Sequence, residues 1–170
     1  MCHPLGMSTA ESFNPALFSR LVDGLYVEAM VMADEARSYF DRKAEEERSD
    51  LDMMGRLTFS CESLKVTTRL MHVIAWLLTQ RGWQRGEISI EALSDPKYRL
   101  GSAAATDPSA LAVMPPCAQE LVRSSEALYE RVRRLQDKMP VSRIPAPASE
   151  EDAPASSPAR DLMSRLEKAF

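Results

Sequence analysis

The sequence predicts an all-α protein, a three-helix bundle with long helices. Three segments repeat their apolar residues at alternating intervals of three and four, and capping residues, prolines or glycines stand near their ends. The 170 residues suit a single domain, and 45% hydrophobic with 27% charged residues is usual for a globular chain. We expect a flexible N-terminus over residues 1–12, the bundle over 13–139, a linker over 140–159 and a short amphipathic motif over 160–170.

The first helix is expected to begin at Pro15 with Asn14 as its cap, because proline is favoured at the first helical position. It should continue into the charged segment 41–48 as a solvated helix end and turn. One apolar stripe follows the helical period, and we expect it to face the partner helices. The stripe comprises Phe18, Val22, Leu25, Ala29, Met32, Ala36 and Tyr39.

The second helix is expected to begin near Ser49 or Asp50 and to end at Gly82 as its C-cap. It carries two apolar stripes. The first comprises Met54, Leu57, Cys61, Leu64, Thr68, Met71, Ala75 and Leu78, and the second comprises Val66, Leu70, Val73, Ile74 and Leu77. Because a helix that is apolar on most sides is buried on most sides, its second half should form the centre of the bundle and contact both other helices.

Residues 86–115 form a long connection. Its first part could hold a short strand or an extra helical turn, and Tyr98 and Leu100 could attach it to the bundle. Loops of this length are usually functional or mobile, although a tolerated insertion is the simpler alternative. The third helix should begin at Pro115 and Pro116 and end at Met139. Its expected stripe comprises Cys117, Leu121, Ser124, Leu128, Val132, Leu135 and Met139.

The composition changes after Pro140. Residues 141–160 contain four prolines and many Ala and Ser residues, with too little apolar surface to offset the entropy of ordering them. Helical periodicity then returns in residues 160–170, where Leu162, Met163, Leu166 and Phe170 are candidate partner-binding anchors. The alternative is a frayed end or a segment that folds back on the bundle.

The end of the third helix is basic, with Arg131, Arg133, Arg134 and Lys138. Cations suit a helix C-terminus because the carbonyl dipoles leave partial negative charge there. The functional alternative is a docking patch for an acidic partner.

We find no motif for catalysis, cofactor binding or metal binding. The glycine-rich phosphate loops, HExxH and the ExxH of carboxylate-bridged metal sites are absent from the sequence. The two histidines are His3 and His72, and we expect His72 to be a packed residue of the second helix. A pair of carboxylates could still meet in space, but nothing in the sequence indicates one.

The charge, the length of the apolar runs and the cysteine content indicate which functions and locations are unfavourable for this chain. A net charge of −4 without a basic stripe is unfavourable for nucleic-acid binding. The most apolar run, residues 70–78, is too short for a bilayer, which needs about 20 residues. Three widely spaced cysteines fit a reducing compartment, where a thiol in an apolar stripe acts as a small hydrophobe. We therefore expect a non-enzymatic, cytoplasmic protein that binds other proteins.

Four segments occur in this order: EAMVMADEARSYFD (28–41), SCESLKVTTRLMHVIAWLLTQR (60–81), GEIS (86–89) and YRLG (98–101). Together they resemble the bacterial RcdA family, the regulators of CtrA degradation. The resemblance covers about residues 12–135, and the segment in the second helix is its most specific part.

This resemblance implies a three-helix bundle that tends to form a homodimer and acts as an adaptor for the ClpXP protease. The implied partners are a CpdR-type response regulator, substrates such as CtrA and, in some assemblies, a PopA-type cyclic di-GMP-binding protein. The alternative is a helical dimerisation or scaffold module with no proteolytic role. An enzyme and a nucleic-acid regulator that uses the basic residues 131–138 are weaker alternatives.

Overall fold

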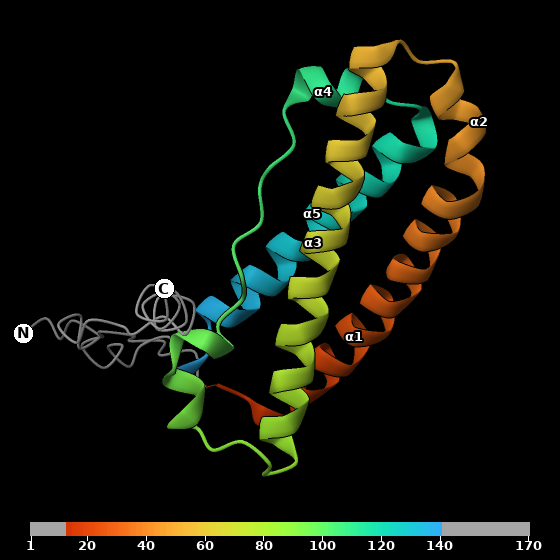
Figure 1. Cartoon of the computed structure of the whole chain (residues 1–170). Coiled ribbons are helices and arrows are strands. Elements are labelled where there is room, and N and C mark those ends of the chain that lie inside the picture. The colour runs from red at the N-terminus through yellow and green to blue at the C-terminus, as the bar shows by residue number, and fades with distance from the viewer. Residues whose placement is uncertain (1–12, 141–170) are drawn as a thin grey trace, which may run out of the picture.

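The computed structural model describes residues 13–140, and three long helices form its body (Figure 1). They are α1 (Pro15–Ser38), α3 (Met53–Gln84) and α5 (Pro116–Asp137). Shorter elements join them: a π-helical turn (Tyr39–Lys43), α2 (Ala44–Ser49), two 3₁₀ turns (Ala92–Ser94 and Pro96–Tyr98) and α4 (Pro108–Ala112). The predicted all-α bundle is confirmed, and the described residues contain no strand. The predicted N-terminal segment, linker and C-terminal motif lie outside these residues.

Helix α1 starts as predicted. The Asn14 side chain accepts a hydrogen bond from the Leu17 amide at 3.1 Å, and Pro15 occupies the first turn. All seven residues of the predicted stripe are buried. The helix does not run straight through residues 41–48, because the π-helical turn separates it from α2. Tyr39 is buried at this turn and its hydroxyl donates to Glu47; burial, and then this hydrogen bond, raise the pKa of Tyr39.

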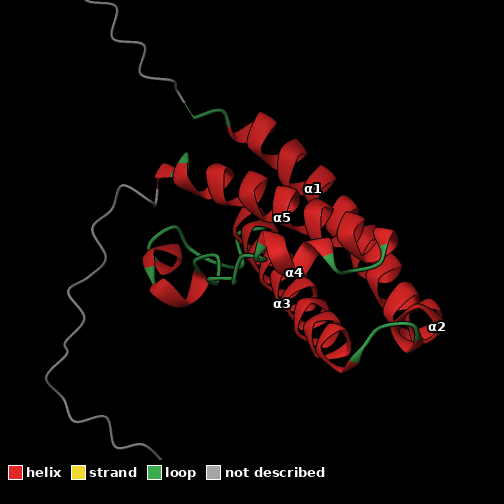
Figure 2. Ribbon diagram, turned by 90° about the horizontal axis from the view of Figure 1, so that it is seen from above, coloured by secondary structure: helices red, strands yellow, loops and turns green. Residues whose placement is uncertain are grey.

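Helix α3 contacts both α1 and α5, as predicted for the second helix. Figure 2 shows the three long helices packed together, seen from above. Val66, Val73 and Leu77 are fully buried on its inner side. Aromatic rings close both ends of the α1–α3 contact. Phe18 and Trp83 lie 5.8 Å apart between ring centroids at one end, and Phe40 and Phe59 lie 5.7 Å apart at the other.

The ends of α3 differ from the prediction. Asp52 caps the helix, and its carboxylate accepts from the Gly55 amide at 2.7 Å. The helix continues past Gly82, which packs under Ile88, and ends at Gln84. The left-handed turn falls instead at Gly86, with φ of +76°, a conformation that glycine adopts without a steric penalty.

Helix α5 buries a stripe that is shifted by one residue in its first half. Ala118, Val122 and Ser125 face the core, whereas the predicted Cys117 is exposed and Leu121 and Ser124 are only partly buried. In the second half, Leu128, Val132 and Met139 are buried as predicted, and Leu135 is half-buried. The first turns of α5 contain few apolar residues. The apolar pattern there could not decide between two stripes that differ by one residue.

The connection from α3 to α5 forms turns rather than a strand. Residues 99–107, which we call the strap, then run along α3 and α5 on the side away from α1 (Figure 1). Tyr98 and Leu100 pack against the core, which confirms that they attach the connection to the bundle. The Leu100 amide donates to the Gln136 side chain at 2.7 Å, and the Tyr129 hydroxyl donates to the Gly101 carbonyl at 2.8 Å.

Candidate protein-interaction surface

The side of α3 that points away from the bundle is apolar. Its exposed fractions reach 68% at Met54, 68% at Leu64 and 64% at Met71. These residues belong to the first stripe predicted for the second helix, so the prediction that this stripe is buried is wrong. We call the exposed set the outer face, comprising Met54, Leu57, Cys61, Leu64, Met71 and Leu78.

The physical reason is that α3 has apolar residues on two opposite sides. Only one side can pack between α1 and α5, and the second stripe, with Val66, Leu70, Val73 and Leu77, takes that place. The longer Met and Leu side chains are left outside, where exposed apolar side chains that lie together mark an interaction surface.

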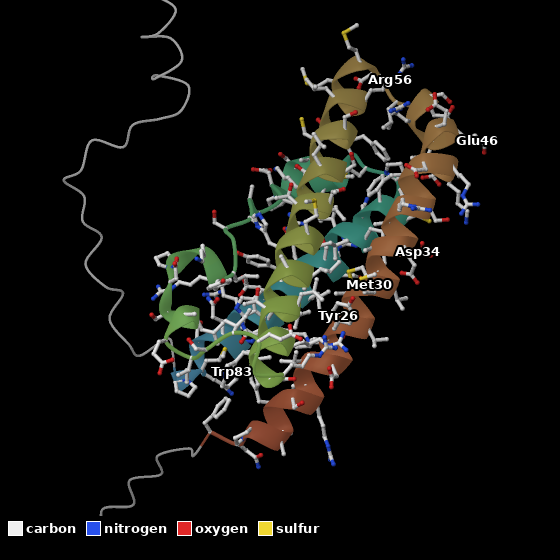
Figure 3. All side chains as sticks on the ribbon, turned by 60° about the horizontal axis from the view of Figure 1, so that its bottom comes forward. Tyr26, Met30, Asp34, Glu46, Arg56 and Trp83 are labelled. Carbon is white, nitrogen blue, oxygen red and sulfur yellow. The ribbon has the colours of Figure 1, made fainter. Side chains whose placement is uncertain are left out.

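Helix α1 adds exposed apolar side chains that do not belong to its predicted stripe. They are Leu17, Leu21, Val27, Met30 and Val31. Figure 3 marks Met30 and Tyr26 along α1 beside α3. Arg81 of α3 lies over the Tyr26 ring at 4.6 Å and pairs with Asp23 at 3.3 Å, so a polar bridge lies between α1 and α3 here. The sequence signal was the presence of apolar residues off the main stripe of α1.

The inner side of α3, in contrast, contains a charged cluster that attaches the strap. Arg69 is 2% exposed and donates to the Ser125 hydroxyl at 2.8 Å and to the Ala104 carbonyl at 2.9 Å. Glu62, also 2% exposed, accepts from Lys65 at 2.7 Å. Thr106 of the strap joins the two, because its hydroxyl donates to Glu62 at 2.7 Å and accepts from Arg69 at 3.1 Å.

This cluster is balanced in charge and hydrogen bonding. Glu126 of α5 lies 3.3 Å from Arg69 and accepts from the Thr106 amide at 2.9 Å. Burial lowers the pKa of Arg69, and the carboxylates of Glu126 and Glu62 act in the opposite direction. A buried charge is tolerated when it is paired and hydrogen-bonded. The cluster therefore serves to hold the strap rather than to react.

The basic residues predicted as a docking patch do not form one group. Arg133 pairs with Glu130 at 2.8 Å, and its spacing places it on another side of α5 from the other three. Arg131 pairs with Glu28 of α1 at 2.6 Å and lines a groove between α1 and α5. Arg134 and Lys138 are exposed on the same side of α5 as Arg131.

Other candidate residues show no catalytic grouping. His72 is partly buried against Gly101, and its Nδ1 has no hydrogen-bond partner within the described part of the chain. Cys61 and Cys117 are exposed thiols, so their expected role as core hydrophobes is wrong.

Across residues 13–140, no three His, Cys, Asp or Glu side chains gather as metal ligands would. None of the helices there is long and apolar enough to span a bilayer.

A small cavity of about 160 Å³ lies where α3, α5 and the 3₁₀ turns meet. Trp76, Gln80, Leu93 and Tyr98 line it, and the side-chain oxygen Oε1 of Gln80 has no hydrogen-bond partner among the described residues. A cavity with such an acceptor is suited to ordered water. Its described lining holds a single carboxylate, Asp137, and therefore no acid–base pair of carboxylates.

Comparison with known proteins shows which family and which solved structure the chain is similar to. The family described as "Protein of unknown function (DUF1465)" matches residues 13–170. No curated protein sequence matches the chain. Among solved structures, RcdA from Caulobacter crescentus CB15 is 33% identical, with a TM-score of 0.58, and the match covers 70% of this chain and 90% of that one.

The chain belongs to the RcdA family. The resemblance read from the four sequence segments is thus confirmed. The RcdA match covers most of RcdA and agrees with the three-helix arrangement seen here. The outer face of α3 and the charged cluster on its inner side follow from this chain's own side chains.

Proposed function

We propose that this RcdA-family protein is a non-enzymatic adaptor that brings substrates such as a CtrA-type cell-cycle regulator to the ClpXP protease. The observation that supports it is the outer face, an apolar surface on a helix whose other side already fills the core. A protein of this family with an apolar surface and no catalytic grouping among its described residues is suited to binding other proteins. The expected cellular location is the cytoplasm, where ClpXP acts.

An adaptor accelerates degradation by holding substrate and protease together. Binding both on one scaffold makes the second encounter intramolecular, and short flexible connections give effective concentrations of about 1 mM. The proposed scaffold contacts are a CpdR-type response regulator, the ClpXP protease and, in some assemblies, a PopA-type cyclic di-GMP-binding protein. The anchors of residues 160–170, namely Leu162, Met163, Leu166 and Phe170, are the proposed tethered contact.

The outer face is proposed to be covered by a second copy of the chain when no other partner is present. Met and Leu side chains dominate it, and long flexible apolar side chains suit contacts between helices. Replacing Leu64 and Met71 with Gln should convert a dimer to a monomer in light scattering. The control is replacement of Arg37 with Gln on an exposed part of α1, which should leave the dimer intact.

Degradation measured in vitro tests the adaptor role. A CtrA-type substrate, ClpXP and a CpdR-type regulator are incubated with and without this protein, and we expect faster loss of substrate only when it is present. A chain ending at Ala159 should deliver substrate more slowly if the terminal anchors take part. Equal rates with and without the full-length protein would overturn the adaptor proposal.

Binding measurements separate the adaptor from a scaffold without a proteolytic role. The adaptor should be retained by immobilised ClpX in the presence of the CpdR-type regulator. A dimer that binds neither protein would favour the scaffold. Salt-dependent affinity for duplex DNA would instead favour a nucleic-acid regulator, because phosphate contacts release counterions.

A further inference from the structure

One surface of the bundle combines an open groove with basic side chains. The groove between α1 and α5 has a volume of about 370 Å³, and Leu21, Gly24 and Leu135 contribute to its lining. Arg20 and Arg131 also line it. Arg134 and Lys138 follow Arg131 at intervals of three and four on the same side of α5. We call Arg131, Arg134 and Lys138 the basic face.

The basic face is only partly neutralised. Arg131 has Glu28 as its partner, and both side chains are well exposed, at 47% and 40%. Arg134 and Lys138 have no carboxylate within ion-pair distance among residues 13–140. The excess positive charge stands out because the whole chain has a net charge of −4. The face thus suits an acidic segment.

The sequence places such a segment close by. Residues 150–152 are Glu-Glu-Asp, and they follow the end of α5 after a short stretch rich in Pro and Ala. Ten residues of chain can span up to about 33 Å. The basic face extends over eight residues, from Arg131 to Lys138, or about 10 Å along the helix axis. The acidic run can therefore reach every residue of the face.

The other acidic run of the chain cannot do so. Residues 45–47 lie in α2, at the opposite end of α1 from the end of α5 (Figure 1). Glu45 pairs with Arg48, and Glu47 accepts from Tyr39.

We propose that residues 150–152 of the chain's own C-terminal segment occupy the basic face and mask it from acidic partners. A single exposed ion pair contributes little, but a tether of this length supplies an effective concentration of about 1 mM. A weak contact is then populated and remains easy to displace. An acidic partner with higher affinity would release the segment. This contact does not depend on the adaptor role.

A paramagnetic NMR experiment on the full-length chain tests the proposal. The native cysteines are replaced (Cys2→Ser, Cys61→Ser, Cys117→Ser), and a nitroxide is attached to Ala153→Cys. We expect the amide signals of residues 131–138 to broaden, while those of α2 stay sharp. The broadening should become clearly weaker in Glu150→Gln/Glu151→Gln/Asp152→Gln, and in about 0.5 M salt, because salt screens exposed charges.

Charge reversal on the helix provides the decisive comparison. Arg134→Glu/Lys138→Glu should weaken the broadening clearly, and adding Glu150→Lys/Glu151→Lys/Asp152→Lys should restore its full strength. The matched control, Arg37→Glu/Arg85→Glu, should leave it unchanged. Broadening of the same strength after neutralisation of the acidic run, or its absence in the starting protein, would overturn the proposal. So would broadening that arises only between a spin-labelled copy and a separate isotope-labelled copy.

Discussion

The two long sides of α3 differ in character. The inner side combines valines and leucines with Glu62, Arg69 and Gln80, all almost completely buried. The outer side is a run of Met and Leu residues at the surface. The charged side chains on the inner side bind the strap: Arg69 donates to the Ala104 carbonyl, and Arg69 and Glu62 both hydrogen-bond to Thr106. Apolar side chains could not make these hydrogen bonds. Side chains of α3 are therefore buried for two reasons: some remove apolar surface from water, and others hydrogen-bond to the strap.

The largest expected effect concerns the inner charge. Arg69→Met should lower the free energy of unfolding by about 3–5 kcal/mol, because removing one partner of a buried pair leaves the others uncompensated. Urea unfolding measures it. The control Arg37→Met alters an exposed arginine and should change the value by less than about 0.5 kcal/mol. A similarly small effect at Arg69 would mean that the inner charges can be removed without loss.

The second largest effect concerns the tight packing of the strap against α3, which an added methyl group at residue 101 would disturb. A Cβ atom at residue 101 would lie 2.6 Å from His72 Nδ1, so Gly101→Ala should cost about 1–3 kcal/mol of unfolding free energy through overpacking. Gly24→Ala is the matched control, since nothing lies within 4 Å of its added Cβ. It should stabilise α1 by about 0.5–1 kcal/mol, measured by urea unfolding. Equal effects at both positions would contradict the tight contact.

A smaller effect is expected from one hydrogen bond on the strap. Tyr129→Phe removes the hydroxyl that donates to Gly101 and should cost about 1 kcal/mol in urea unfolding. It should also speed amide hydrogen exchange of the strap more than that of α1. For comparison, Tyr26→Phe removes a hydroxyl that has no hydrogen bond among the described residues. A loss of stability at Tyr26 as large as at Tyr129 would argue against a specific contact at the strap.

The smallest effect is expected on the outer face. Leu64→Gln should change the unfolding free energy of the monomer by less than about 0.5 kcal/mol, because the side chain is mostly exposed. Leu70→Ala, on the inner side of the same helix, should cost about 2–5 kcal/mol. Both are measured at concentrations low enough to keep the protein monomeric. A large cost at Leu64 would place the outer face within the fold of a single chain.

The sequence predicted α1 well because its stripe has no competitor of equal length, and all seven stripe residues are buried. It failed to choose between the two sides of α3, since each side carries an apolar stripe with helical spacing. Glu62 and Arg69 lie on the same helical face as Val66 and Val73, at intervals of three and four residues. Charged residues on a face argue against its burial unless a partner for them is known. The partner, Thr106, lies 37 residues from Arg69 and forms no local pattern with it.

The contact between His72 and Gly101 links two positions that are distant in sequence. Because the imidazole ring fills the space where a side chain at 101 would begin, neither position can change freely on its own. Among relatives that keep the strap, a residue larger than glycine at 101 should occur together with a small residue at 72. This correlated substitution is a signature that can be sought in sequences alone, and it would show which relatives retain the same path of the strap across α3.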